Sequence, residues 1–388
     1  MPNTNTFSTS DVIPRLLAQG LLALRQMAIT PRFVNRDYEL LAGEKGSTVD
    51  VNIPSAITAQ DVTPSNTPPD DAGVVPTKVA LAMDNWKEAP FFLSDKDMLE
   101  VMNGVIPMQA SEAVKAIANA VDNSILALYK GVYGYAGTAG TTPYGNDLGA
   151  FLTADQILND QLAPMEPRVH LINAKAKANA MGLRAFQDAS YRGDAAGIMK
   201  GDIGEKLGAF WAMNQNMPRH TAGTITTGLI TKAATVVAAG ATSFVATTAA
   251  STGACALLQG DIINIAGHNQ TYAVGANVTQ ASAATDTAAI SITPGLEFAL
   301  AGSEAVTVKS SHRVNLLMHR DAIALATRPF SGADPMGLGT YQSAVDPISG
   351  LTLRLEVTRQ HKRTRFAYDM LWGTKLIRAA LATRVAGE

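Results

Sequence analysis

The feature that most constrains this chain is a long extended segment, residues 46–92. Its first part has alternating apolar residues at Val49, Val51 and Ile53, which predicts a strand with one buried face. A stretch rich in Pro, Asp and Gly then predicts a tip, and an extended run, TKVALAMDNWKEAPFFL, returns from it. Together these runs predict one two-stranded finger. An isolated hairpin of this length is marginal in water, and the same chain offers no obvious partner segment, so we expect the finger to lie on a neighbouring subunit.

Composition agrees with a chain that buries much of its surface against copies of itself. The 388 residues allow two or three domains, and 47% are hydrophobic whereas only 16% are charged, which is low for a free soluble enzyme. The formal net charge of -2 creates no strong field that would gather nucleic acid non-specifically. A single cysteine, Cys255, excludes an internal disulfide framework.

Three stretches have helical patterns. An amphipathic helix is predicted over 12–29, after a polar tail, and we interpret both as an arm. The longest predicted helix runs from about Pro107 to Tyr129. A last amphipathic helix is predicted from Thr374 to Arg384. The apolar positions of the long helix step by three or four residues along one face, at Val114, Ile117, Val121, Ile125 and Leu128.

The composition changes between Thr224 and Lys309, where charged residues are few and short β-branched runs alternate with Gly or Asn. This pattern predicts an inserted antiparallel barrel or sandwich. After it, HRVNLLMH predicts a strand and RDAIALAT a short helix. Two alternating runs follow, from Leu351 and from Phe366, joined by the basic turn RQHKRTR.

The sequence offers no catalytic motif. His319-Arg320-Asp321 spells the catalytic loop of protein kinases, but position 326 is alanine where a metal-binding asparagine is required, and no glycine-rich loop precedes it. We interpret Asp321 as an acidic residue in the first turn of a helix. Histidine spacing gives no support for zinc, and there is neither a P-loop nor a nucleophile elbow. We therefore expect no catalytic, cofactor or metal residues.

Charge clusters are the remaining candidates for a site. The basic turn around residues 359–365 is most simply a solvated hairpin tip, and the alternative is a contact between subunits or with DNA on the inside. The acidic finger tip has the same two interpretations. A hypothesis that joins them is that finger tips and basic turns meet between subunits. The candidate inter-subunit contacts are Asp70, Asp71, Trp86, Arg359, Lys362, Arg363 and Arg365.

Three stretches, in this order, carry a resemblance to a known family: NMPRHTAG (216–223), HRDAIALATRPF (319–330) and MLWGTKLIRAALATRV (370–385). They resemble the major capsid proteins of tailed double-stranded DNA bacteriophages, in the branch of the short-tailed Salmonella phage coat protein. The first is similar to the stem that leads into that family's inserted domain, the second to the sequence that follows the insertion, and the third to the closing segment.

The resemblance implies an α+β, Hong Kong 97-type capsid fold. The implied parts are an N-terminal arm (1–37), an extended loop (38–93), a peripheral domain with the spine helix (94–139 and 346–388), an axial domain (140–223 and 310–345) and an inserted antiparallel β domain (224–309). The insertion is shorter than in the type member, and no lysine and asparagine here identify themselves as a cross-linking pair.

The implied function is structural. The resemblance implies a virion capsid protein, not an enzyme, that is assembled in the host bacterial cytoplasm into pentamers and hexamers around packaged double-stranded DNA, with scaffolding protein and portal as partners. One alternative is the shell protein of a cellular nanocompartment with the same fold. An alternative of another class is a soluble enzyme with a pocket in 165–222.

Overall fold

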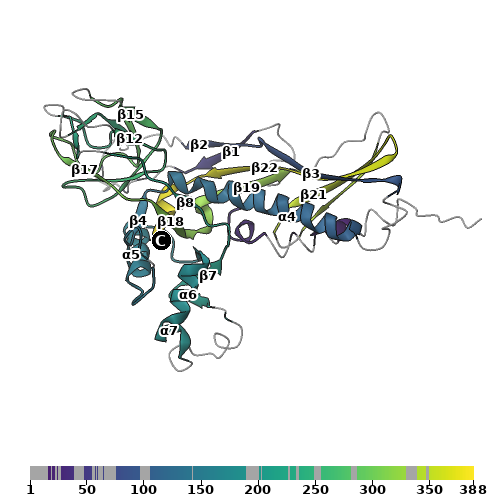
Figure 1. Cartoon of the computed structure of the whole chain (residues 1–388). Helices are drawn as coiled ribbons and strands as arrows, with labels where there is room; N and C mark the ends of the chain where they lie inside the picture. The colour runs from purple at the N-terminus through teal and green to yellow at the C-terminus, as the bar shows by residue number, and fades with distance from the viewer. Residues whose placement is uncertain are drawn as a thin grey trace, which may run out of the picture.

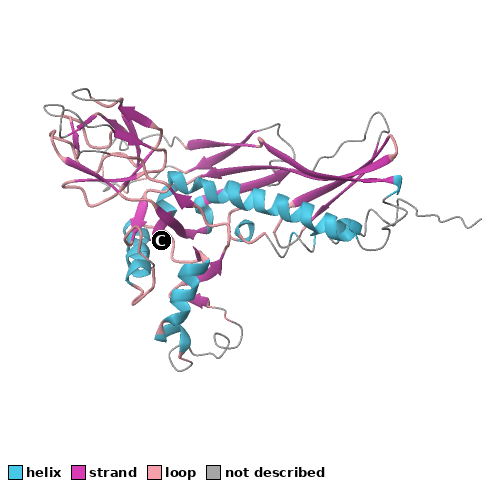
Figure 2. Cartoon of the chain, in the orientation of Figure 1, coloured by secondary structure: helices cyan, strands magenta, loops and turns pink. Residues whose placement is uncertain are grey.

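A long helix and a long β-sheet lie side by side through the molecule, and a β-barrel stands at one end of them (Figure 1). The computed structural model describes residues 16–18, 20–21, 24, 28–38, 48–54, 57, 59, 64, 76–96, 105–141, 143–188, 201, 203–225, 228–232, 236–248, 255–280, 286–328, 339–346 and 349–388. The helices belong to the body of the molecule, outside the barrel (Figure 2).

The long helix is α4 (Val105–Leu126), which continues into the 3-10 helix η2 (Ala127–Gly131). Val114, Val121 and Ile125 are fully buried along one face, so the predicted helix and its apolar side are confirmed. Within the described residues, no helix combines the length and apolarity that crossing a membrane requires. The other helical segments are η1 (Thr30–Arg32), α5 (Gly149–Asp160), α6 (Ala174–Gly182), α7 (Arg184–Gln187), η3 (Arg320–Ala322) and η4 (Ala379–Leu381).

Helix α4 packs on the long antiparallel sheet. Its strands are ordered β19-β22-β21-β20, with β3 also paired to β22. The indole nitrogen of buried Trp372 on β22 donates to Ser124 Oγ of α4 at 2.8 Å, which ties helix to sheet. The predicted hairpin around the basic turn is confirmed. The strands are β3 (Asn85–Ser94), β19 (Ile323–Arg328), β20 (Gly339–Val345), β21 (Thr352–Gln360) and β22 (Arg363–Leu376).

The extended segment 46–92 is not one two-stranded finger. β1 (Thr48–Ile53) pairs with β2 (Thr77–Ala82), whereas the end of the returning run is the separate strand β3, paired with β22. Val49 and Leu81 on this hairpin bury against Ala324 of β19 in one cluster. The expectation that the same chain offers no partner is therefore wrong for the described strands.

The partner of the hairpin was not expected because its sequence, within RDAIALAT, predicts a helix and not a strand. Only Arg320–Ala322 form a turn of 3-10 helix, and β19 follows it directly. Its first five residues are all buried: Ile323 and Leu325 face the main core, whereas Ala324 and Ala326 face the hairpin. A strand covered on both faces has no polar alternation, so an alanine-rich example has the sequence pattern of a helix.

A second sheet forms the centre of the body, in the order β4-β23-β18-β5-β7-β6, with β8 paired to β18. The predicted helix from Thr374 to Arg384 is wrong, because this stretch contains the end of β22, η4 and the start of β23. All six residues of β23 are buried between β4 and β18, so the pattern again lacks alternation. The strands are β4 (Gly134–Ala136), β5 (Arg168–Ile172), β6 (Gly204–Lys206), β7 (Ala209–Met213), β8 (Arg219–His220), β18 (His312–His319) and β23 (Ala382–Gly387).

The described strands between residues 229 and 308 form the barrel. The strand order is β10-β16-β14-β13-β17-β9-β11, and all pairings are antiparallel. Because β10 and β11 are separated by one residue, the sheet closes on itself, and apolar side chains such as Ile263, Tyr272 and Val306 fill it. The strands are β9 (Leu229–Thr231), β10 (Ser243–Phe244), β11 (Ala246–Thr248), β13 (Ile262–Ile265), β14 (Tyr272–Val274), β16 (Ile290–Thr293) and β17 (Ala305–Val308), beside the pair β12 (Cys255–Leu257) and β15 (Val278–Gln280).

Candidate assembly surface and barrel junction

The basic turn is an exposed hairpin tip between β21 and β22. Arg359 forms an ion pair with Asp95 of the same chain, with 2.5 Å between Nη2 and Oδ2. The Asp95 amide also donates to the Lys362 carbonyl oxygen at 3.1 Å. The hydrogen bond from Arg359 lowers the pKa of the Asp95 carboxyl group. The turn is thus held against the end of β3 by its own chain.

The other candidate contact residues lie along β3 and β22. Arg365 donates from Nη2 to both carboxylate oxygens of Glu88, at 2.7 and 2.6 Å. The Arg363 guanidinium stands 4.8 Å from the ring centroid of Phe92. Trp86 is 63% exposed and lies at the other end of β3. The structure therefore brings these side chains onto one sheet edge, whereas Asp70 and Asp71 lie outside the described residues.

Beneath this edge lies a buried ion pair that the sequence did not indicate. Arg354 donates from Nε and Nη2 to the two carboxylate oxygens of Asp369, at 2.8 and 2.5 Å. Trp86 Nε1 also donates to Asp369, at 3.1 Å. This bidentate pairing raises the pKa of Arg354. Asp369 thus fixes both a cation and the exposed indole above it.

The kinase-like tripeptide has a structural role. The Asp321 amide donates to His319 Nδ1 at 3.2 Å, which caps η3. Asp321 Oδ1 accepts from Asn35 Nδ2 at 2.7 Å, and Arg320 pairs with Asp37 at 2.7 Å. His319-Arg320-Asp321 therefore fastens residues 35–37 to the body.

A second fastening point of the N-terminal segment lies on the spine helix. Asn214 Nδ2 donates to Thr30 Oγ1 at 2.8 Å and to Asp122 Oδ2 at 3.1 Å. Asp122 is 1% exposed, and its other oxygen has no hydrogen-bond partner among the described residues. Burial raises the pKa of this carboxyl group to about 6.

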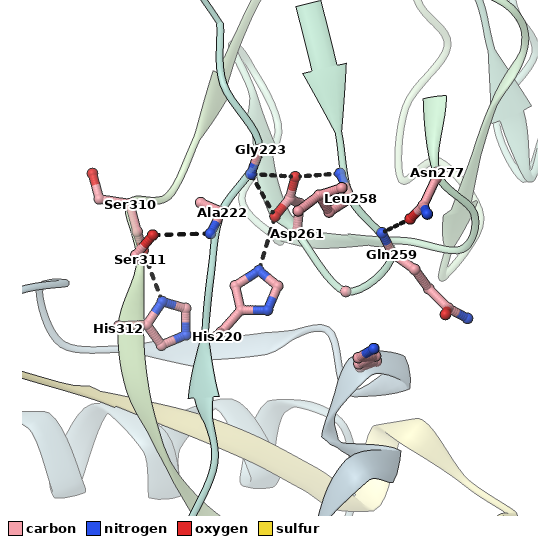
Figure 3. Close-up of polar contacts among 12 residues, drawn as sticks. His220, Ala222, Gly223, Leu258, Gln259, Asp261, Asn277, Ser310, Ser311 and His312 are labelled. Atoms are coloured by element: carbon pink, nitrogen blue, oxygen red, sulfur yellow. Dashed lines mark hydrogen bonds and ion pairs between the residues drawn. The ribbon is translucent and has the colours of Figure 1, made fainter. Parts of the chain in front are cut away.

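A buried polar cluster joins the barrel to the body, and Figure 3 shows its barrel side. Asp261 is fully buried between β12 and β13. Its carboxylate accepts from His220 Nε2 at 2.8 Å and from the amides of Gly223 and Leu258 at 3.1 and 2.7 Å (Figure 3). The other ring nitrogen of His220 lies 3.0 Å from Tyr129 Oη on η2. One imidazole therefore bridges body and barrel.

Arg384 and His312 complete the cluster. Arg384 is fully buried on β23 and donates to the carbonyl oxygens of Gly260 and Lys130 at 2.7 and 3.1 Å. Burial lowers its pKa to about 9, so it stays cationic at neutral pH. His312 Nδ1 lies 2.8 Å from the Ser310 carbonyl oxygen. We call Tyr129, His220, Asp261, His312 and Arg384 the junction cluster.

The members of the junction cluster come from distant segments, so no local sequence pattern predicts them. The two histidines meet only through the pairing of β8 with β18. Asp261 and Arg384 looked like isolated charges in apolar stretches. A charged residue inside an otherwise apolar strand was the available signal, since such a residue is buried only with partners.

Among the described residues, no three His, Cys, Asp or Glu side chains are grouped so that they could hold a metal ion. A cavity of about 330 Å³ does occur in the region of the alternative enzyme pocket. The described residues that line it include no carboxylate, histidine or thiol; they are Ile29, Arg32, Phe33, Ile172, Lys177, Ile203, Phe210, Trp211, Ala212 and Met213.

The fold of this chain is similar to that of solved phage proteins. No protein-family model and no curated protein matches the sequence. A solved chain from Mycobacterium phage Che8 is similar with a TM-score of 0.53 and 15% identity, over 92% of this chain and 90% of that one. The capsid structure of cyanophage P-SCSP1u gives 0.49 and 12%, over 88% and 84%. The mature capsid of bacteriophage PhiM1 gives 0.46 and 10%, over 89% and 83%.

The likeness to the Che8 chain spans nearly the whole of both chains, so it concerns the complete architecture and not one module. The expected α+β class and Hong Kong 97-type capsid fold are confirmed.

Proposed function

We propose that this chain is a structural major capsid protein that self-assembles into the pentamers and hexamers of an icosahedral phage head. It is a virion protein, assembled in the bacterial cytoplasm, and it encloses packaged double-stranded DNA without sequence-specific binding. The observation that carries the proposal is the capsid-type fold shared with a phage chain over 92% of this sequence. The stretches that resemble the coat-protein family lie in the stem, after the barrel and at the closing strand.

Cohesion in such a shell comes from many modest contacts. Buried apolar area contributes about 25 cal/mol per Å² before the costs of association are subtracted. Helix α4 and the long sheet supply a rigid frame. The β1–β2 hairpin packs on β19 of this sheet, and the basic turn joins β21 to β22 at its tip. In this proposal each subunit consists of the arm (1–37), the extended loop (38–93) and the peripheral, axial and inserted domains, and these parts make the contacts of the shell. Scaffolding protein and portal are its partners.

Imaging tests this function directly. The purified chain, with and without a co-expressed scaffolding protein, is examined by electron microscopy and size-exclusion chromatography. Closed shells or curved sheets of hexamers are expected. A small discrete oligomer whose stability depends on a small ligand would instead support an enzyme. Shells that form in the native host without nucleic acid would support a nanocompartment.

The candidate contacts Asp70, Asp71, Trp86, Arg359, Lys362, Arg363 and Arg365 belong to this proposal. Arg365 already pairs with Glu88 of its own chain, so reversing its charge alone confuses folding with assembly. The sharper variant is Lys362→Glu, which changes the charge of the turn and leaves the Arg359–Asp95 and Arg365–Glu88 pairs in place. The double variant Glu88→Arg with Arg365→Glu tests Arg365 separately, because it reverses the charge at position 365 and preserves the ion pair with reversed sign. Lys362→Glu should reduce assembly and leave subunit unfolding unchanged; normal assembly would remove the turn from the contact set.

A further inference from the structure

The root of the barrel holds two histidines in contact. The chain enters the barrel after β8 and leaves it before β18, and these strands pair at His220 and His312. The two ring centroids are 5.4 Å apart. Just beyond them, the Ala222 amide donates to Ser311 Oγ at 2.9 Å (Figure 3). Any change in how the barrel stands on the body must act on this pair of strands.

Two side chains of the junction cluster connect body to barrel by hydrogen bonds. Arg384, on a strand of the body, donates to Gly260 at the barrel and to Lys130 at the end of η2. His220 lies between Tyr129 of the body and Asp261 of the barrel. A further bond runs from Thr271 Oγ1 to the Tyr133 carbonyl oxygen at 2.7 Å. The cluster is therefore the main polar attachment in this part of the molecule.

Hydrogen-bond chemistry fixes where the protons are. A carboxylate only accepts, so His220 carries a proton on Nε2; in the neutral imidazole, Nδ1 then accepts from the Tyr129 hydroxyl. A carbonyl only accepts, so His312 carries its proton on Nδ1 and donates to Ser310. His312 Nε2 is then a buried lone pair with no partner in the described part of the chain. With both histidines neutral, Asp261 and Arg384 balance each other.

A proton on His312 has nothing to balance it. The single carboxylate of the cluster, Asp261, is already engaged by His220, Gly223 and Leu258. The charged and titratable groups that act on the imidazole are Arg384 on β23, His220 on β8, Asp261 before β13 and Tyr135 on β4. One step further out, Tyr129 on η2 contacts His220, and Lys309, just before β18, stands over the Tyr135 ring. The imidazolium would therefore be buried beside the Arg384 cation, and only access to water relieves it.

We propose that the junction cluster is an acid-opened clasp, in which protonation of His312 releases the root of the barrel from the body. The clasp is a property of the subunit and does not rest on the proposed shell function. Opening separates β8 from β18 and exposes the imidazolium to solvent, while the barrel itself stays folded around its own core.

The direction of the pH effect follows from linkage. Burial, with Arg384 and His220 nearby, lowers the pKa of His312 to about 4 from its ordinary 6.5. Between these values the open form binds a proton that the closed form does not. The ratio of open to closed molecules therefore rises as pH falls, by up to about tenfold for each pH unit.

Hydrogen–deuterium exchange of the purified full-length protein tests the clasp. The reporters are the Ala222 and Val314 amides, which in the closed form donate across the β8–β18 pair to Ser311 Oγ and to the Pro218 carbonyl oxygen. After correction for intrinsic exchange, their protection should fall by up to about tenfold per unit from about pH 6.5 to about pH 4.5. Amides of Ile263 and Ile265, inside the barrel, should stay protected. Simultaneous loss of protection at all four positions would mean global unfolding and would overturn the proposal.

A variant and its control assign the effect to one side chain. His312→Gln, which cannot take up the proton, should abolish the pH dependence. His268→Gln, on the barrel beside Tyr272 and Phe298, should retain it. Persistence of the dependence in His312→Gln would refute the assignment. If that variant does not fold, exchange at the imidazole C2 hydrogen of the unaltered protein gives the pKa of His312, which must be depressed and must govern the opening curve; titration near pH 6.5 would refute the clasp.

Discussion

Arg384 and Gly260 are joined by a hydrogen bond of 2.7 Å from the guanidinium Nη1 to the carbonyl oxygen, across 124 positions of sequence. The bond brings the last strand of the body to the turn between β12 and β13. It also places a fully buried cation near the buried Asp261 carboxylate, which contributes to the charge balance of both.

Replacing Arg384 by Met should therefore be strongly destabilising. The change leaves Asp261 as a buried charge without its cation and leaves two carbonyl oxygens unpaired, which costs about 3–5 kcal/mol. Arg219→Met, at an exposed position on β8, should change stability by less than about 0.5 kcal/mol. Denaturant unfolding of the two variants makes the comparison, and equal effects would contradict the role of Arg384.

Leu162 offers a stabilising substitution. It ends α5 in a left-handed conformation with φ 57°, and the Ala163 and Leu162 amides donate to Leu158 and Asn159, as in a Schellman motif. Its side chain is 90% exposed, so burial does not offset the backbone strain. Leu162→Gly should raise the free energy of unfolding by about 0.5–1 kcal/mol.

The matched control is Leu152→Gly in the interior of the same helix. It should lower stability by about 1 kcal/mol, because glycine costs conformational entropy there. Thermal unfolding decides between the two signs. Loss of stability in Leu162→Gly would mean that its side chain makes a contact within the subunit.

Asp122→Asn should stabilise the subunit near neutral pH. Because the folded pKa is raised to about 6 from 3.8, the folded protein binds more protons than the unfolded chain between these values. Stability from this group therefore rises as pH falls towards 4, and the ionised carboxylate is a cost at pH 7. Asparagine removes that cost and can still accept from Asn214, so a gain of about 1–3 kcal/mol at pH 7 is expected.

Asp155→Asn is the opposite case and serves as control. Asp155 pairs with the buried guanidinium of Arg168 at 2.5 Å, so neutralising it should destabilise the protein. Urea midpoints measured at about pH 7 and about pH 5 compare both variants. A destabilised Asp122→Asn variant at neutral pH would contradict the stated direction.

Gly373→Ala should loosen the β1–β2 hairpin. A Cβ at this position would lie 2.3 Å from the Ala82 carbonyl oxygen, so the hairpin would have to move off β22. A loss of about 1–3 kcal/mol is expected, with faster proteolysis near residue 82. Gly182→Ala, where nothing lies within 4 Å, should have no such effect. Unchanged proteolysis in Gly373→Ala would show that the hairpin is not seated there.

The sequence by itself determined the elements in which apolar and polar residues follow a regular pattern. The spine helix has one apolar face, the β21–β22 hairpin alternates on both arms, and the barrel strands are bounded by turn residues. These signals are local, because the spine helix keeps one exposed side and the strand runs are marked in the sequence itself by alternation or by turn residues. The three stretches that resemble the coat-protein family also indicated the capsid fold before any contact was known.

Only the tertiary structure decided the elements that have no such pattern because both of their faces are buried. β19 and β23 are covered on both faces, so alanine-rich stretches that suggest helices are strands there. The partner of the β1–β2 hairpin was hidden for the same reason, because it is β19. The junction cluster was equally unreadable, since pairing between distant strands brings its charges together and local sequence carries no record of that pairing.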